Sequence, residues 1–169
     1  GDLVSIPYEA NVVAVSKDDA NVYVGGKDCK IHVYSVVDGT FLKEKHVITD
    51  HLKPIHTLAL DNEGRLVAGD ERDICVWNLD DYSAVIGPGR WCFHTQRVTC
   101  LAIQDDFVAS GGADDSIYIW NIHSTMKRVH YNFCHRGGLV ALEFLQDRKL
   151  LSVGVDSVVQ VWDIAADVK

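Results

Sequence analysis

The chain has 169 residues, of which 47% are hydrophobic, and its formal net charge at pH 7 is −8. This apolar content can form a core and excludes a disordered chain, and the acidic balance argues against general nucleic-acid binding, which depends on Lys and Arg contacts with phosphate. A membrane-spanning helix requires about 18 consecutive apolar residues, and no uncharged apolar run in the chain approaches that length. Five cysteines without close pairing favour reduced thiols in the cytoplasm.

The sequence repeats itself with a period of 42 or 43 residues. An aromatic residue closes one short apolar run in each repeat, and it is found at Tyr34, Trp77, Trp120 and Trp162. Six residues before each aromatic is an acid, namely Asp28, Glu71, Asp114 and Asp156. Each repeat begins 26 or 27 residues before its aromatic, with Tyr8, His51, His94 and His135. This recurrence indicates one structural unit that is present four times.

Each repeat is predicted to contain three clear strands and a weaker fourth, because its apolar runs are short, rich in β-branched and aromatic residues, and bounded by Gly and Asp. In chain order the predicted strands are 12–15, 21–25, 30–34, 40–44, 55–60, 65–69, 74–77, 82–86, 98–103, 107–111, 117–121, 127–132, 139–144, 149–153 and 158–162. The fourth repeat has no fourth strand of its own. A further short strand is predicted from Leu3 to Ile6.

Four strands in about 43 residues are typical of a propeller blade. In its repeat-start histidines, turn acids and closing aromatics the chain resembles the WD40 repeat family, although only Trp162-Asp163 has the Trp-Asp dipeptide. The resemblance implies an all-β fold, a partial WD40 β-propeller with four blades of antiparallel sheet, the last blade lacking its own outer strand. The expected blades are 8–44, 51–86, 94–133 and 135–164. Since such propellers most often have seven blades, residues 1–169 are expected to be the C-terminal part of a longer propeller.

Two repeats contain a Ser-His-Asp set, the residue types of a serine hydrolase. With the closing tryptophan, the two sets are His94, Ser110, Asp114, Trp120 and His135, Ser152, Asp156, Trp162. One active site needs one set, so recurrence at the repeat spacing favours a structural network, in which Asp accepts from turn amides and His connects it to Ser and Trp. We therefore predict no catalytic residue and no enzyme activity.

The first two repeats depart from this network. Val24 and Val67 stand in the place of the serine, Tyr8 stands in the place of the first histidine, and Glu71 stands in the place of the second aspartate. We expect these two blades to be held more by packing.

No metal or other cofactor is predicted. Despite Cys134-His135 and a total of eight histidines, neither a Cys-x-x-Cys nor a His-Glu-x-x-His motif occurs. Cys75 and Cys100 lie in predicted strands, where they are best interpreted as small buried hydrophobic residues.

One rim of the propeller, formed by the loops between blades and by the turns between the second and third strands, is predicted to bind a protein partner. The candidate residues on this rim are Lys53, Arg72, Arg90, Trp91, Arg97 and Arg136. Arg and Trp are common at binding hot spots, although Trp91 has equal reason to pack under its own loop.

The open edge of the last predicted strand, 158–162, is a template for pairing. The N-terminal segment could complete the fourth blade, in the same chain or in another, or two copies could close head to tail into an eight-bladed ring. Self-association through open blade edges is therefore expected alongside the interpretation that we favour, a piece of a longer propeller.

The segments 12–15, 22–28, 33–35 and 108–114, followed by a last blade that begins at His135, are similar to the second propeller of the actin-interacting protein 1 family. The resemblance implies a non-enzymatic module of a cytoplasmic, cytoskeleton-associated protein that promotes actin filament disassembly together with cofilin. The segment from Asp70 to Asp73 departs from the family pattern, and no actin-contact residue can be assigned. The alternative is a general WD40 scaffold or a peptide-reading adaptor of another multiprotein complex.

Overall fold

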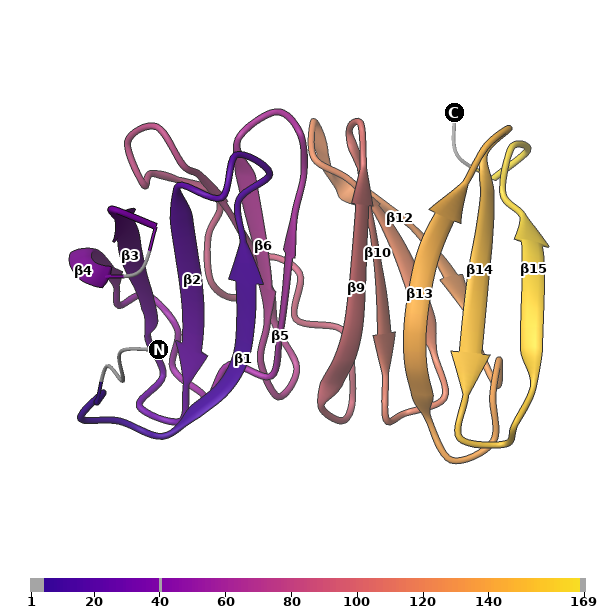
Figure 1. Cartoon of the computed structure of the whole chain (residues 1–169). Helices are drawn as coiled ribbons and strands as arrows, with labels where there is room; N and C mark the ends of the chain where they lie inside the picture. The colour runs from indigo at the N-terminus through magenta and orange to yellow at the C-terminus, as the bar shows by residue number, and fades with distance from the viewer. Residues whose placement is uncertain (1–4, 40, 168–169) are drawn as a thin grey trace.

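The computed structural model describes residues 5–39 and 41–167, and the elements found there are β-strands in four antiparallel sheets (Figure 1). The first sheet, blade 1, contains β1 (Ala10–Val15), β2 (Asn21–Gly26), β3 (Ile31–Val37) and β4 (Phe41–Ile48). Blade 2 contains β5 (Thr57–Leu60), β6 (Arg65–Gly69), β7 (Ile74–Asn78) and β8 (Ala84–Ile86). Blade 3 contains β9 (Val98–Gln104), β10 (Phe107–Gly112), β11 (Ile117–Asn121) and β12 (Ser124–Tyr131). Blade 4 contains β13 (Leu139–Leu145), β14 (Lys149–Gly154) and β15 (Val159–Asp163).

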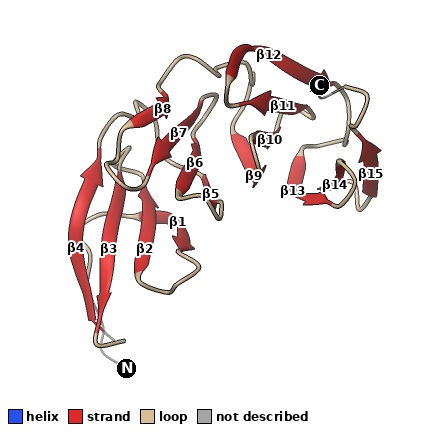
Figure 2. Cartoon of the chain, turned by 90° about the horizontal axis from the view of Figure 1, so that it is seen from above, coloured by secondary structure: helices blue, strands red, loops and turns tan. Residues whose placement is uncertain are grey.

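The predicted fold class is confirmed. The strands of each blade pair in sequence order, and the last blade has three strands where the others have four. Seen from above, the blades form an open arc with β1, β5, β9 and β13 on its concave side (Figure 2). The described residues contain no helix that is long and apolar enough to cross a membrane.

The core lies between the blades rather than within them, because one sheet has to bury its apolar face against the next. Three buried clusters fill the three junctions, and each contains the closing aromatic or the inner-strand residues of neighbouring blades. Trp77 and Trp120 are fully buried there. Full burial of a Val, Leu, Ile, Phe or Met side chain in such a cluster stabilises the fold by roughly 1.5–3 kcal/mol, and a buried indole is among the largest apolar surfaces removed from water.

The turn between the second and third strands has the same backbone in three of the blades. Five residues before the closing aromatic, Cys29, Asp115 and Ser157 adopt positive φ angles of 65°, 63° and 64°. Arg72 occupies this place in blade 2 and does not share that conformation. The turn from Asp70 to Asp73 is therefore built differently, and this difference moves the acid of blade 2.

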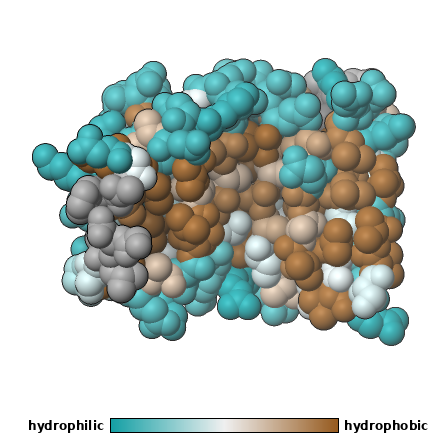
Figure 3. All heavy atoms as spheres, in the orientation of Figure 1, coloured by the Kyte–Doolittle hydropathy of each residue, from teal (hydrophilic) through white to brown (hydrophobic). Residues whose placement is uncertain are grey.

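The free face of blade 4 is apolar. Val155, Val159 and Val161 are exposed, and hydrophobic residues gather over β13–β15 on the right of Figure 3. β15 pairs with β14 alone among the described strands. Of the strand predicted before blade 1, Leu3 and Val4 lie outside the described residues, and Ser5 and Ile6 form no strand, so they do not pair with β15.

Candidate functional site

A single chain of hydrogen bonds connects the polar residues of blade 3. The Nδ1 atom of His94 lies 3.0 Å from Oδ1 of Asp114, and its Nε2 atom lies 2.9 Å from the Ser110 hydroxyl. The indole Nε1–H of Trp120 donates to the same hydroxyl oxygen at 3.0 Å. Because a carboxylate only accepts, Nδ1–H of His94 donates to Asp114, and in the neutral imidazole this leaves Nε2 to accept from Ser110.

Blade 4 repeats this arrangement. The Nδ1 atom of His135 lies 3.0 Å from Asp156, Nε2 lies 2.7 Å from the Ser152 hydroxyl, and Trp162 donates to that hydroxyl at 2.9 Å. A glycine is required beside each imidazole, since a Cβ on Gly112 would lie 2.5 Å from Nδ1 of His94.

The hydrogen bonds connect Asp, His and Ser in the same order as in a serine hydrolase, but a substrate cannot reach the serine hydroxyls. Ser110 and Ser152 are 0% exposed, and each hydroxyl also accepts from an indole. A nucleophile has to meet a substrate carbonyl, and no carbonyl reaches a hydroxyl in this position. We propose that both sets hold the blades together and have no catalytic role.

The carboxylates of these networks are stabilised in their charged form. Burial disfavours the charge on Asp114, but hydrogen bonds from His94 and from the amides of Thr95 and Ser116 outweigh it and hold the pKa of Asp114 below its ordinary value. The amide of Arg136 and the imidazole of His135 lower the pKa of Asp156 in the same way. Each carboxylate therefore secures its turn as an ion at neutral pH.

In blade 2 the acid is Asp70 and not Glu71, which corrects the prediction from the repeat frame. Nδ1 of His51 lies 3.1 Å from Oδ2 of Asp70, and the other carboxylate oxygen accepts from the amides of Arg72 and Asp73 at 2.9 Å. The physical reason is the different turn, which brings the residue one position earlier against the histidine. Glu71 is left exposed at the surface.

In blade 2, Val67 stands in the place of the serine, and within the described structure this leaves polar atoms without hydrogen-bond partners. Among the described residues, the buried Nε2 of His51 and the buried Nε1 of Trp77 have no hydrogen-bond partner. These are the two atoms that a serine hydroxyl would join, as Ser110 does in blade 3. The network of blade 2 is therefore half complete.

Blade 1 uses other groups. The hydroxyls of Tyr8 and Tyr34 lie 2.6 Å apart. His32 stacks on Tyr8, and its two ring nitrogens lie 2.7 Å from Glu44 and 3.0 Å from Asp28. The repeat pattern did not predict a role for His32 or Glu44, because neither position carries a repeated residue type.

The predicted rim residues do not all reach the surface. Trp91 is 0% exposed and stacks on Trp120 with ring centroids 4.9 Å apart, so it packs under its loop and is not an exposed contact. The side chain of Arg72 donates to the carbonyl of His94 at 2.9 Å. Arg72 is nevertheless exposed, as are the remaining candidates Lys53, Arg90, Arg97 and Arg136.

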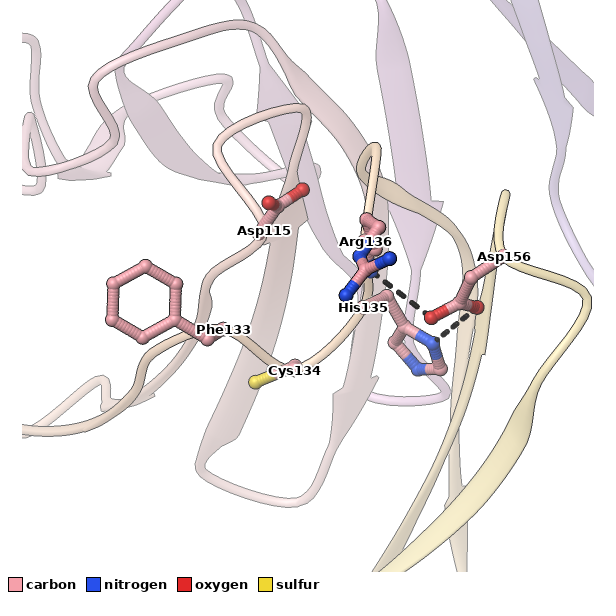
Figure 4. Close-up of a pocket in the computed structure, with 6 residues that line it drawn as sticks. All are labelled: Asp115, Phe133, Cys134, His135, Arg136 and Asp156. Carbon is pink, nitrogen blue, oxygen red and sulfur yellow. Dashed lines mark hydrogen bonds and ion pairs between the residues drawn. The ribbon is translucent and has the colours of Figure 1, made fainter.

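Two cavities open on this rim. One, of about 510 Å³, lies between His51, Lys53, Asp70, Pro88 and Cys92. The other, of about 460 Å³, lies between blades 3 and 4 and is lined by Asp115, Phe133, Cys134, His135, Arg136 and Asp156 (Figure 4). We call the second cavity the blade 3–4 pocket. Sequence reasoning identified Arg136 in it but missed Phe133, whose exposure depends on the loop backbone.

The cysteines are free thiols in the described structure. Cys75 and Cys100 are buried, as predicted, and burial raises the pKa of the Cys100 thiol to about 12. Within the described residues, no group of three or more His, Cys, Asp or Glu side chains is placed to hold a metal ion.

Comparison with known proteins gives a family and several relatives. The family model for the WD domain, G-beta repeat, matches residues 42–78, 89–121 and 126–163. The 66 kDa stress protein of Physarum polycephalum is 33% identical over 95% of this chain and 27% of its own length. Actin-interacting protein 1 of Drosophila melanogaster is 30% identical over 94% of this chain and 26% of its own length. The chain thus spans about a quarter of the length of the curated relatives that it matches.

Solved structures agree on the fold. A chain in the mitotic checkpoint complex superposes with a TM-score of 0.82 at 20% identity, covering 97% of this chain and 50% of that chain. The computationally designed Ika4 protein gives a TM-score of 0.79 at 23% identity, covering 96% of this chain and 95% of that chain.

Proposed function

Because the chain belongs to the WD40 family of WD domain, G-beta repeats, we propose that it is a non-enzymatic protein-interaction module that takes part in cofilin-dependent disassembly of actin filaments. The observation that carries this proposal is the 30% identity with a protein named Actin-interacting protein 1 along 94% of the chain. The buried position of both Ser-His-Asp sets supports an interaction role over a hydrolytic one. Actin and cofilin are the proposed partners, in the cytoplasm and at the cytoskeleton.

We also propose that residues 1–169 are the C-terminal part of a longer propeller. The open arc of four blades and the coverage of about a quarter of each relative support this proposal.

Sedimentation with filaments tests the proposed function. The chain is centrifuged with actin filaments, with and without cofilin, and we expect a larger fraction in the pellet when cofilin is bound. A chain that stays in the supernatant under both conditions contradicts the proposal. A short peptide that binds the rim of such a chain would favour the alternative, an adaptor of another complex.

A further inference from the structure

On the rim that carries both cavities, several acids form hydrogen bonds inside the blades, whereas the cations point to solvent. Asp70, Asp114 and Asp156 turn inward, where they accept hydrogen bonds from histidines and turn amides. The cations Lys53, Arg90, Arg97 and Arg136 are exposed, and no ion pair joins them to an acid within the part of the chain that the structure describes. The acids of this rim that remain exposed or partly exposed, Asp50, Glu71 and Asp115, are fewer than these four cations, so the exposed charge of the rim is mainly positive, although the whole chain carries a charge of −8.

The blade 3–4 pocket is lined by one of these cations, Arg136, and also by Asp115, with which Arg136 forms no ion pair in the described structure. The oxygens of Asp156 are occupied by Nδ1 of His135 and by the amides of Arg136 and Val158, at 3.0–3.1 Å. This carboxylate therefore holds the backbone of Arg136 and leaves the guanidinium of the same residue for another acid (Figure 4). A guanidinium in this state is suited to a bidentate bond with a carboxylate.

Phe133 adds an exposed apolar side chain to the lining of the same pocket. Its side chain is 91% exposed, and its backbone has a φ of 55°, a left-handed conformation that is unusual for a bulky residue. The amide of Cys134 donates to the carbonyl of Asp115 at 2.8 Å and fixes the bend that follows it. The ring stands apart from the other labelled side chains in Figure 4, so the loop presents it to solvent.

We propose that the blade 3–4 pocket binds an acidic segment of a partner protein, with a carboxylate on Arg136 and a neighbouring apolar side chain against Phe133. Charge complementarity with the mainly positive rim favours an acidic partner, and an exposed aromatic and an arginine that line one pocket have the composition of a binding hot spot. The inference rests on the proposed function, since the segment would belong to the filament or to its bound partner.

A direct binding measurement tests the pocket. The probe is a fluorescein-labelled peptide of Glu and Asp residues around one Phe, and its counterpart has Lys in place of every acid. We expect the acidic peptide to raise the fluorescence anisotropy and the lysine peptide to leave it unchanged. Arg136→Glu and Phe133→Ala are each expected to weaken acidic-peptide binding by about tenfold or more.

A matched control separates the pocket from general charge. Lys17 is exposed on the turn between β1 and β2, on the opposite rim, and Lys17→Glu changes the net charge as much as Arg136→Glu does. We expect Lys17→Glu to bind like the unchanged chain. Equal losses from Lys17→Glu and Arg136→Glu, or no preference for the acidic peptide, would overturn the inference. Melting temperatures of all variants establish that they are folded.

The filament assay distinguishes this inference from the function on which it rests. If the chain pellets with filaments and both pocket variants pellet to the same extent, the pocket is not the binding site, but the proposed function is retained. If the chain does not pellet with filaments but binds the acidic peptide through Arg136, the proposed function is contradicted and the proposed peptide site is retained.

Discussion

A single hydroxyl distinguishes the complete networks from the incomplete one. Val67 takes the place that Ser110 has in blade 3, and the buried Nε2 of His51 and Nε1 of Trp77 are left without partners among the described residues. A buried polar group without a partner costs about 1–3 kcal/mol. The replacement of Val67 by a residue with a hydroxyl is therefore a stringent test of the network.

We expect Val67→Ser to raise the free energy of unfolding by about 1 kcal/mol, since two restored hydrogen bonds outweigh the lost methyl contacts. Urea denaturation measures the change. Val67→Ala removes the same methyl groups without adding a hydroxyl, and we expect it to be destabilising. If Val67→Ser were no more stable than Val67→Ala, the vacant hydroxyl would have no energetic role.

Asp114 and Asp115 form a matched pair of adjacent acids. Asp114 accepts from His94 and two turn amides, whereas the side chain of Asp115 makes no hydrogen bond in the described structure. We expect Asp114→Ala to lower the free energy of unfolding by about 1–3 kcal/mol and Asp115→Asn, which tolerates the positive φ of 63° at that position, to change it by less than about 0.5 kcal/mol. Equal melting of Asp114→Ala and the unchanged chain would contradict the structural network.

At the scale of the element, the turns between second and third strands form an acid-sensitive set. The pKa values of Asp70, Asp114 and Asp156 lie below the ordinary value of 3.8. A pKa that is lower in the folded chain than in the unfolded chain contributes stability above the unfolded value, and this contribution is lost as the pH falls through the folded value.

We therefore expect the free energy of unfolding to fall as the pH drops below about 4. Urea denaturation at a series of pH values between neutral and acidic measures the decline. Asp114→Asn removes one of the three titrating groups, so its decline should be shallower. Parallel curves for the two proteins would show that Asp114 is not linked to the acid transition.

The strands were largely predictable from the sequence, and the turns and loops were not. The short β-branched runs predicted the bounds of the inner strands to within about two residues. The bounds of the fourth strands were harder to predict, because β4 extends to Ile48 through exposed charged residues. The repeat spacing predicted Glu71 as the acid that contacts the histidine of blade 2, whereas Asp70 makes that contact in the structure. Trp91 and Phe133 show the limit most clearly, since only tertiary packing decides which of two loop aromatics is buried.

At the scale of the whole molecule, the open edge of β15 has a measurable consequence. Val161 is 55% exposed on this strand, and an unpaired apolar edge favours pairing with another chain. We propose that the chain self-associates through this edge. Sedimentation velocity should show oligomers that Val161→Lys reduces, because a charged side chain on an edge strand opposes pairing. A clean monomer of the unchanged chain at all concentrations would remove the proposal.

The junction between blades 2 and 3 is fastened at both rims. The amide of Val98 donates to the carbonyl of Asp70 on the pocket rim, and the guanidinium of Arg65 reaches Asp105 and Asp106 on the other. Blades 2 and 3 can therefore separate only if contacts break at both ends of their shared face.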